Sequence, residues 1–222
     1  MEMSVTPDSI QQLLTSEELG DRLRGVNQLR QIEPEKAFEL IQTPIKDKDT
    51  RVRYAAVSQM SSLGEQNLTI SQEILRDCLL NDPEPDVQAA AADALGALKI
   101  TQAFDDLQQV YQNTPEWLVK VSIVAAIGEM GEPKALFLLE DALKSDNELI
   151  QTMAISALGE LGNLAAIPLL KPFVVHSDWQ IRYRLVQALH RLGGLEAKQI
   201  IEQLASDSFQ QVAQEAKLAL NS

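Results

Sequence analysis

Apolar residues recur along this chain in a pattern that is itself repeated. The clearest copies are VKVSIVAAIGEMG at 119–131, IQTMAISALGELG at 150–162 and IRYRLVQALHRLG at 181–193. Their apolar positions fall at offsets 0, 4, 8 and 11, the spacing of a helix with one buried face. We therefore predict a helix in each copy and call it helix B. The positions at offset 0, spaced by 35, 32, 31, 31 and 31 residues and expected to be buried, are Val52, Val87, Val119, Ile150, Ile181 and Val212.

Boundary signals surround several of these predicted helices. Asp49, Asn147 and Asp178 stand where a side chain would cap the helix N-terminus. Glycines follow the last apolar position at Gly64, Gly131, Gly162 and Gly193. Between the copies lie second apolar stretches such as KALFLLEDAL at 134–143, which predict a shorter helix A. Proline lies near the start of helix A at Pro34, Pro133 and Pro168, where its missing N–H costs nothing.

Paired helices repeated about every 31 residues are typical of an α-solenoid, in which each repeat buries its apolar face against its neighbours. No useful run of β-alternation is present, so the predicted fold class is all-α, a right-handed solenoid of about seven repeats. We expect one domain over 1–222. Within it, 49–222 hold the regular repeats and 1–48 a degenerate N-terminal capping repeat, in which Arg22 matches Arg53.

The pattern V-R/K-x-x-A-x-x-A-L-G-x-L-G in these copies resembles the short HEAT-like repeats of the phycobilisome-lyase type. The resemblance covers 49–222 well and the first 48 residues weakly. This family includes the E/F-type phycobilin lyases, which attach open-chain tetrapyrroles to cysteines of phycobiliproteins, and the NblB-type proteins of phycobilisome degradation. A length near 220 residues covered by one repeat array is most similar to the degradation type.

The resemblance implies a protein that binds phycobiliproteins of the phycobilisome and their bilin chromophore, and that assists chromophore detachment or disassembly. It implies no tightly bound cofactor and at most a transient phycobilin. Two alternatives stay open: a subunit of an E/F-type phycobilin lyase or isomerase, and a generic HEAT-repeat adaptor that binds an amphipathic helix. Whether the protein is an enzyme, attaching or detaching bilin, also stays open. Further expected partners are a small degradation adaptor or a second HEAT-like subunit.

Basic residues recur at offset 1 of helix B, at Arg22, Arg53, Lys120 and Arg182. The resemblance implies that they pair with an acidic residue at a helix start, such as Asp49 or Asp178. Because they recur from repeat to repeat, we predict a role in the scaffold.

The charge balance and the lengths of the apolar runs argue against two function classes. Lys and Arg total 19 against 32 Asp and Glu, a net charge of −13, which argues against a nucleic-acid-binding face. No apolar run approaches the ~18 residues of a membrane span. The first cation is Arg22, so we expect no positively charged targeting leader. We therefore expect a cytoplasmic protein without membrane insertion.

Motifs for nucleotide binding, serine hydrolysis and zinc proteolysis are absent, and no His-Glu dipeptide occurs, so neither catalytic nor metal-ligating residues are predicted. The single cysteine, Cys78, rules out an internal disulfide. Its place in an apolar run of helix A favours a buried core residue over a reactive thiol.

The outward face of helix B is the predicted binding surface. If offsets 4 and 8 are buried, then offsets 2, 3, 6, 9 and 10 point away from the core. The middle repeats carry small or apolar residues there, such as Val121, Gly128, Met153 and Gly159. The sixth repeat differs from them and has Tyr183, Arg184, Gln187, His190 and Arg191.

This group of polar side chains next to an apolar trough predicts a site for an apolar body that carries carboxylates. A solvated helix face would have the same composition, so the sequence leaves both interpretations open. Trp117 and Trp179, each two residues before the offset-0 position, are further candidates. They are either contacts at the rim of the trough or packing residues of the loops between repeats.

Overall fold

The computed structural model describes residues 5–222, and within that range it contains helices and no strand. The chain divides into two compact units, Met1–Ser122 and Ile123–Ser222, which we describe separately. The all-α class and the HEAT-like solenoid repeats are confirmed. A single domain over 1–222 stays a prediction, and residues 1–4 of the expected capping repeat lie outside the described residues.

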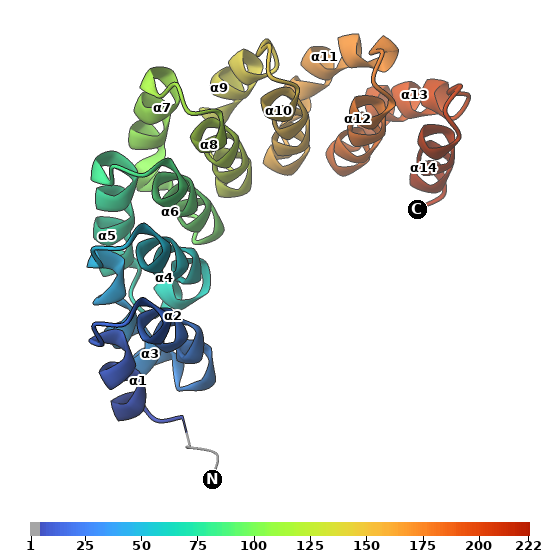
Figure 1. The fold of residues 1–222 in the computed structure, drawn as a ribbon. Helices are drawn as coiled ribbons and strands as arrows, with labels where there is room; N and C mark the ends of the chain where they lie inside the picture. The colour runs from blue at the N-terminus through green and yellow to red at the C-terminus, as the bar shows by residue number, and fades with distance from the viewer. Residues whose placement is uncertain (1–4) are drawn as a thin grey trace. The chain divides into compact units, whose positions relative to one another are not determined.

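In the first unit, α2, α4 and α6 pack side by side (Figure 1). Helix α1 contacts α2, α3 contacts α4, and α5 contacts both α6 and α7. The α-helices are α1 Pro7–Leu14, α2 Leu19–Gln28, α3 Pro34–Ile41, α4 Thr50–Leu63, α5 Leu68–Asn81, α6 Pro85–Ala97 and α7 Phe104–Asn113. Short 3-10 helices link them: η1 Leu29–Gln31, η2 Pro44–Lys46, η3 Gly64–Gln66 and η4 Thr101–Ala103. Helix α8, Trp117–Met130, begins in this unit and ends in the next.

In the second unit, α10 packs against α12, and α12 against α14 (Figure 1). Its elements are α9 Ala135–Ala142, α10 Glu148–Leu161, η5 Leu164–Ala166, α11 Ile167–Leu170, η6 Lys171–Val175, α12 Trp179–Leu192, α13 Gly194–Leu204 and α14 Gln210–Asn221. Helices α4, α6, α8, α10, α12 and α14 are the predicted helices B.

The predicted register is confirmed, because all six offset-0 residues are at most 4% exposed. The predicted N-caps are confirmed as well. The carboxylate or amide oxygens of Asp49, Asn147 and Asp178 each accept a backbone N–H of the first turn, at 2.8–3.0 Å. Each cap satisfies a donor that the helix itself leaves unpaired.

The predicted glycine stops divide into two kinds. Gly131, Gly162 and Gly193 have φ of 69°, 68° and 67°, the left-handed region where a side chain would be strained. Gly64 instead has φ −62° and continues into η3. A Cβ at Gly64 would lie 2.5 Å from Cδ1 of Leu98. Helix α4 ends at Leu63, so the predicted helix end is confirmed, but Gly64 does not produce it through a left-handed conformation.

The loop that enters each helix B has the same geometry in every regular repeat. Five positions before the register residue, a side chain accepts the backbone N–H of the residue two positions later, at 2.7–3.2 Å. The accepting residues are Asp47, Asp82, Thr114, Ser145, His176 and Asp207. This hydrogen bond turns the chain into the helix.

Three of the four recurrent basic residues form ion pairs with these loop residues. Nε of Arg22, Arg53 and Arg182 lies 2.7 Å from a carboxylate oxygen of a loop aspartate in the next repeat. The aspartates are Asp47, Asp82 and Asp207, and all six side chains are 7–12% exposed. These pairs join consecutive repeats, which supports the predicted scaffold role.

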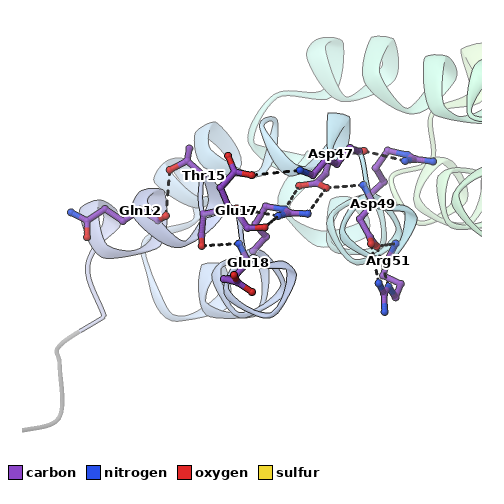
Figure 2. A network of polar contacts seen from close by, with 11 residues as sticks. Gln12, Thr15, Glu17, Glu18, Asp47, Asp49 and Arg51 are labelled. Atoms are coloured by element: carbon purple, nitrogen blue, oxygen red, sulfur yellow. Dashed lines mark hydrogen bonds and ion pairs between the residues drawn. The ribbon is translucent and has the colours of Figure 1, made fainter.

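The expected pairing with Asp49 or Asp178 was therefore wrong, because both residues cap their own helices. Figure 2 shows Asp49 facing Arg51, while Asp47, beside it, takes part in the inter-repeat contacts. The hydrogen bond from the Arg51 side chain lowers the pKa of Asp49 to about 2. Lys120 has a different contact: its Nζ lies 5.3 Å from the ring centroid of Tyr111.

Candidate functional site

The outward face of helix B is more buried than the sequence predicted. Offset 9 is a packing position in the second unit: a Cβ at Gly128 would lie 2.7 Å from Cα of Ala157, and one at Gly159 would lie 2.7 Å from Cα of Ala188. Gly128 and Gly159 are buried for this reason. The expected trough of small exposed residues is wrong at these positions, because glycine allows neighbouring helices B to touch.

The sixth repeat differs at this surface, as predicted. On α12, Arg184, His190 and Arg191 are exposed, and Tyr183 and Gln187 are half-buried. One turn separates most of these side chains, so they form a single strip along the helix.

Glu215 of α14 organises one end of this strip. The Tyr183 hydroxyl donates to Oε2 of Glu215 at 3.1 Å, and Nε2 of Gln187 donates to Oε1 at 3.2 Å. Partial burial and then the bond to Glu215 raise the pKa of Tyr183. Nη1 of Arg184 donates to Oε1 of Gln187 at 3.1 Å. The carboxylate of Glu215 thus holds two side chains of α12 in place.

The two arginines of the strip have different environments. Nη1 of Arg191 lies 3.0 Å from Oε1 of Glu160, the residue at the same offset one repeat earlier. Arg184 contacts the neutral amide of Gln187, and among residues 5–222 no carboxylate forms an ion pair with it. Among the described residues, Arg184 is therefore the arginine of the strip that forms no ion pair.

A hollow of about 420 Å³ opens beside the strip, between α12 and α14. It is lined by Gln187, His190, Arg191, Glu215, Leu218, Ala219 and Ser222. Sequence reasoning missed Glu215 and Leu218. Both stand at outward offsets of the last helix B, 3 and 6, so the same offset map continued into α14 would have found them. Leu218 is 67% exposed and supplies apolar surface at the hollow.

The remaining candidates are distributed over both units. Met153 of α10 is half-buried in the second unit, and Val121 of α8 is half-buried in the first. Trp179 stacks on Phe209 with ring centroids 4.3 Å apart, so it is a packing residue of the loop that enters α14. Trp117, at the start of α8, is 50% exposed.

Other chemistry is sparse in the described part of the chain. Cys78 is buried, as predicted, and burial raises the pKa of its thiol to about 12. Among residues 5–222, no group of three His, Cys, Asp or Glu side chains is arranged to hold a metal ion. No helix in this range is long and apolar enough to cross a bilayer.

Comparison with known proteins gives the family. A family model of HEAT repeats matches residues 72–153 and 141–221, whereas no curated protein matches the sequence. Among solved structures, the complex of CpcE and CpcF of phycocyanin lyase from Nostoc sp. PCC7120 is similar, with 20% identity, a TM-score of 0.63, and coverage of 99% of this chain and 95% of that chain. An archaeal HEAT-like repeats protein from Thermococcus onnurineus NA1 aligns at 12% identity and a TM-score of 0.59, covering 99% and 97% of the two chains.

At these identities the solved structures establish a common fold, and the function of each belongs to that protein. The family model covers more than half of this chain, in the same region as the regular repeats derived above. The chain belongs to the HEAT-repeat family.

Proposed function

We propose that this protein binds phycobiliproteins through the strip on α12 and the adjoining hollow, and that it assists detachment of their bilin chromophore or disassembly of the phycobilisome. The observation that carries the proposal is an exposed arginine without an ion pair within residues 5–222, Arg184, bonded to Gln187 at a hollow that exposes Leu218, in a chain with a net charge of −13. Such a surface attracts a partner that presents a carboxylate beside apolar groups. The fold shared with phycocyanin lyase supports phycobiliproteins as that partner.

The experiment is incubation of the purified protein with holo-phycocyanin. Binding is measured by size-exclusion chromatography, and chromophore release by visible absorbance of the protein-bound fraction. We expect Arg184→Glu to weaken binding at least about tenfold, as loss of a charged anchor does. The loss should be smaller at high salt, where the charge is screened. Lys171→Glu makes the same charge change at an exposed position of η6 and should leave binding unchanged.

A second candidate function is that of one subunit of a phycobilin lyase or isomerase. The observation that favours it is that the similar lyase structure is a complex of two proteins. A mixture of this protein with apo-phycocyanin and free phycocyanobilin, with and without a second HEAT-repeat subunit, separates the two functions. Covalent addition of bilin supports the lyase function, and loss of bilin from holo-phycocyanin supports the detachment function.

A further inference from the structure

The loop that enters α12 differs from the other helix B loops in the chemistry of its hydrogen-bond acceptor. Here Nδ1 of His176 accepts the backbone N–H of Asp178 at 3.1 Å. The other loops use carboxylates or hydroxyls, at Asp47, Asp82, Thr114, Ser145 and Asp207. Hydroxyls do not titrate near neutral pH, and carboxylates ordinarily stay ionised down to about pH 4. Imidazole instead gains a proton between about pH 8 and pH 5, so in this set the acceptor at His176 is the one lost in mild acid.

The hydrogen bond fixes the position of the proton on His176. A backbone N–H only donates, so Nδ1 is the unprotonated ring nitrogen and the ring proton lies on Nε2. A proton added to Nδ1 would place an N–H against the N–H of Asp178 across 3.1 Å. Two donors cannot bond to each other, so the loop at 176–178 has to rearrange.

The start of α12 also disfavours a positive charge on His176. Nη1 of Arg182 donates to the carbonyl oxygens of His176 and Ser177, at 2.6 and 3.2 Å, which places a guanidinium beside the loop. The N-terminus of α12 adds the positive end of the helix dipole. The nearest carboxylate in the chain, that of Asp178, is occupied, because its Oδ1 accepts the N–H of Gln180 at 2.8 Å. An imidazolium that turned toward Asp178 would compete with this helix cap.

The other elements around the loop supply neutral or solvent-exposed groups. The ring of Phe173 in η6 lies 6.1 Å from the imidazole, centroid to centroid. Gln151 of α10 precedes His176 by 25 residues, as Arg182 precedes Asp207, and its Nε2 donates to the carbonyl oxygen of Leu143 at 2.9 Å. Helix α13 packs against η6 as well. The charged residues of η6 and α13 are all exposed: Lys171, Glu196, Lys198 and Glu202.

We propose that the loop at 176–178 is a pH-sensitive switch, in which protonation of His176 breaks its bond to the N–H of Asp178 and loosens the first turn of α12. Arg182 connects this loop to the next repeat. The same guanidinium that holds the carbonyl oxygens of 176 and 177 also holds the carboxylate of Asp207, with Nε 2.7 Å from Oδ2.

The switch controls the helix that carries the strip from Tyr183 to Arg191. Loosening the first turn of α12 and the contacts of Arg182 loosens the frame that holds the strip next to Glu215 of α14. Binding through the strip should therefore be weaker in mild acid than at neutral pH. This effect on binding rests on the proposed function, whereas the change in the loop does not.

Two substitutions test the loop, because the chain has two histidines. His176→Ser keeps an acceptor of the kind present at Ser145 and cannot titrate, and His190→Gln removes the other imidazole. The measurement is the hydrogen-exchange protection of the backbone amides at the start of α12, at pH 8 and pH 5. Protection should fall about three- to tenfold at pH 5 in the original protein and in His190→Gln, as loss of one hydrogen bond does, and stay constant in His176→Ser. An equal fall in His176→Ser, or no fall in the original protein, would overturn the switch.

The starting state is tested without any variant. The ¹⁵N chemical shifts of the His176 imidazole in the original protein report which ring nitrogen carries the proton. At pH 8 we expect the proton on Nε2 and an unprotonated Nδ1. A proton on Nδ1 at that pH would also overturn the switch.

The effect on binding is measured with holo-phycocyanin at the same two pH values. Phycocyanin titrates too, so the original protein is compared with His176→Ser at each pH. From pH 8 to pH 5 the original protein should lose at least about threefold more affinity than the variant. Equal losses would overturn the control of binding and leave the proposed function standing. No binding at either pH would overturn the proposed function, and the protection of α12 would still decide the switch.

Discussion

Arg182 and Asp207 form a two-pronged ion pair between consecutive repeats. Nε of Arg182 lies 2.7 Å from Oδ2 of Asp207, and Nη2 lies 2.9 Å from Oδ1. The side chains are 11% and 7% exposed, and the same aspartate also accepts the backbone N–H of Phe209. Asp207 thus links the repeat before it to the helix after it.

This pair predicts a loss of stability in acid. The hydrogen bond from Arg182 lowers the pKa of Asp207 below its usual value of 3.8. The ion pair therefore stabilises the folded protein above pH 3.8, and this stabilisation is lost as the pH falls through the lower pKa of the folded state. Asp207→Asn should reduce the free energy of unfolding at pH 7 by about 1–3 kcal/mol, because it leaves a buried guanidinium without its carboxylate. Below pH 4, the stability of the Asp207→Asn variant should also decline less than that of the original protein. Urea titrations from pH 2 to 7 measure both effects.

The control for this change is Glu160→Gln at the pair with Arg191, whose side chains are 38% and 52% exposed. An exposed pair contributes at most about 1 kcal/mol, so this variant should stay close to the original protein. Equal effects of the two substitutions would show that the inter-repeat pair has no special role.

A methyl group at Gly159 should be costly. Its Cβ would lie 2.7 Å from Cα of Ala188, a backbone atom that cannot move without shifting α12. We expect Gly159→Ala to destabilise the protein by about 1–3 kcal/mol, as overpacking does. Gly20 of α2 has nothing within 4 Å of an added Cβ, so Gly20→Ala should be neutral or stabilise by up to about 1 kcal/mol. Urea denaturation of both variants measures the difference.

Cys78 should be unreactive in the folded protein. The thiolate is the reacting species, and burial raises the pKa of this thiol to about 12. Alkylation by iodoacetamide at pH 8 should be at least about tenfold slower in the folded protein than in guanidinium chloride. Because the chain has one cysteine, mass spectrometry follows this reaction directly. Labelling of the folded protein at the unfolded rate would contradict the buried position.

The two tryptophans should have different fluorescence. Trp179→Phe leaves Trp117, which is 50% exposed, so emission should shift to longer wavelength and acrylamide should quench it strongly. Trp117→Phe leaves Trp179 stacked on Phe209, where quenching should be weaker. A further change of Phe209→Ala should raise the quenching of Trp179. Identical quenching in the two single variants would disagree with these positions.

The repeat and its register can be derived from the amino-acid sequence alone, because a buried face at helical spacing leaves a periodic pattern whatever its neighbours are. Val52 and Ile150 are buried and Asp178 caps α12 as that pattern required. These properties depend on local propensity and on burial of one face of one helix. The contrast at His190, where the three preceding copies have glycine, was also visible in the sequence.

Contacts between residues of different repeats depend on how the helices pack in three dimensions. Arg182 pairs with Asp207, 25 residues later, and Arg191 pairs with Glu160, 31 residues earlier. The composition of the chain does not show which of its many acidic side chains each arginine contacts. Likewise, glycine at position 159 looks like open surface along one helix, and only the packing of α12 on α10 makes it a contact. Distances between helices set both the pairing of charges and the hollow beside His190, and no single helix encodes them.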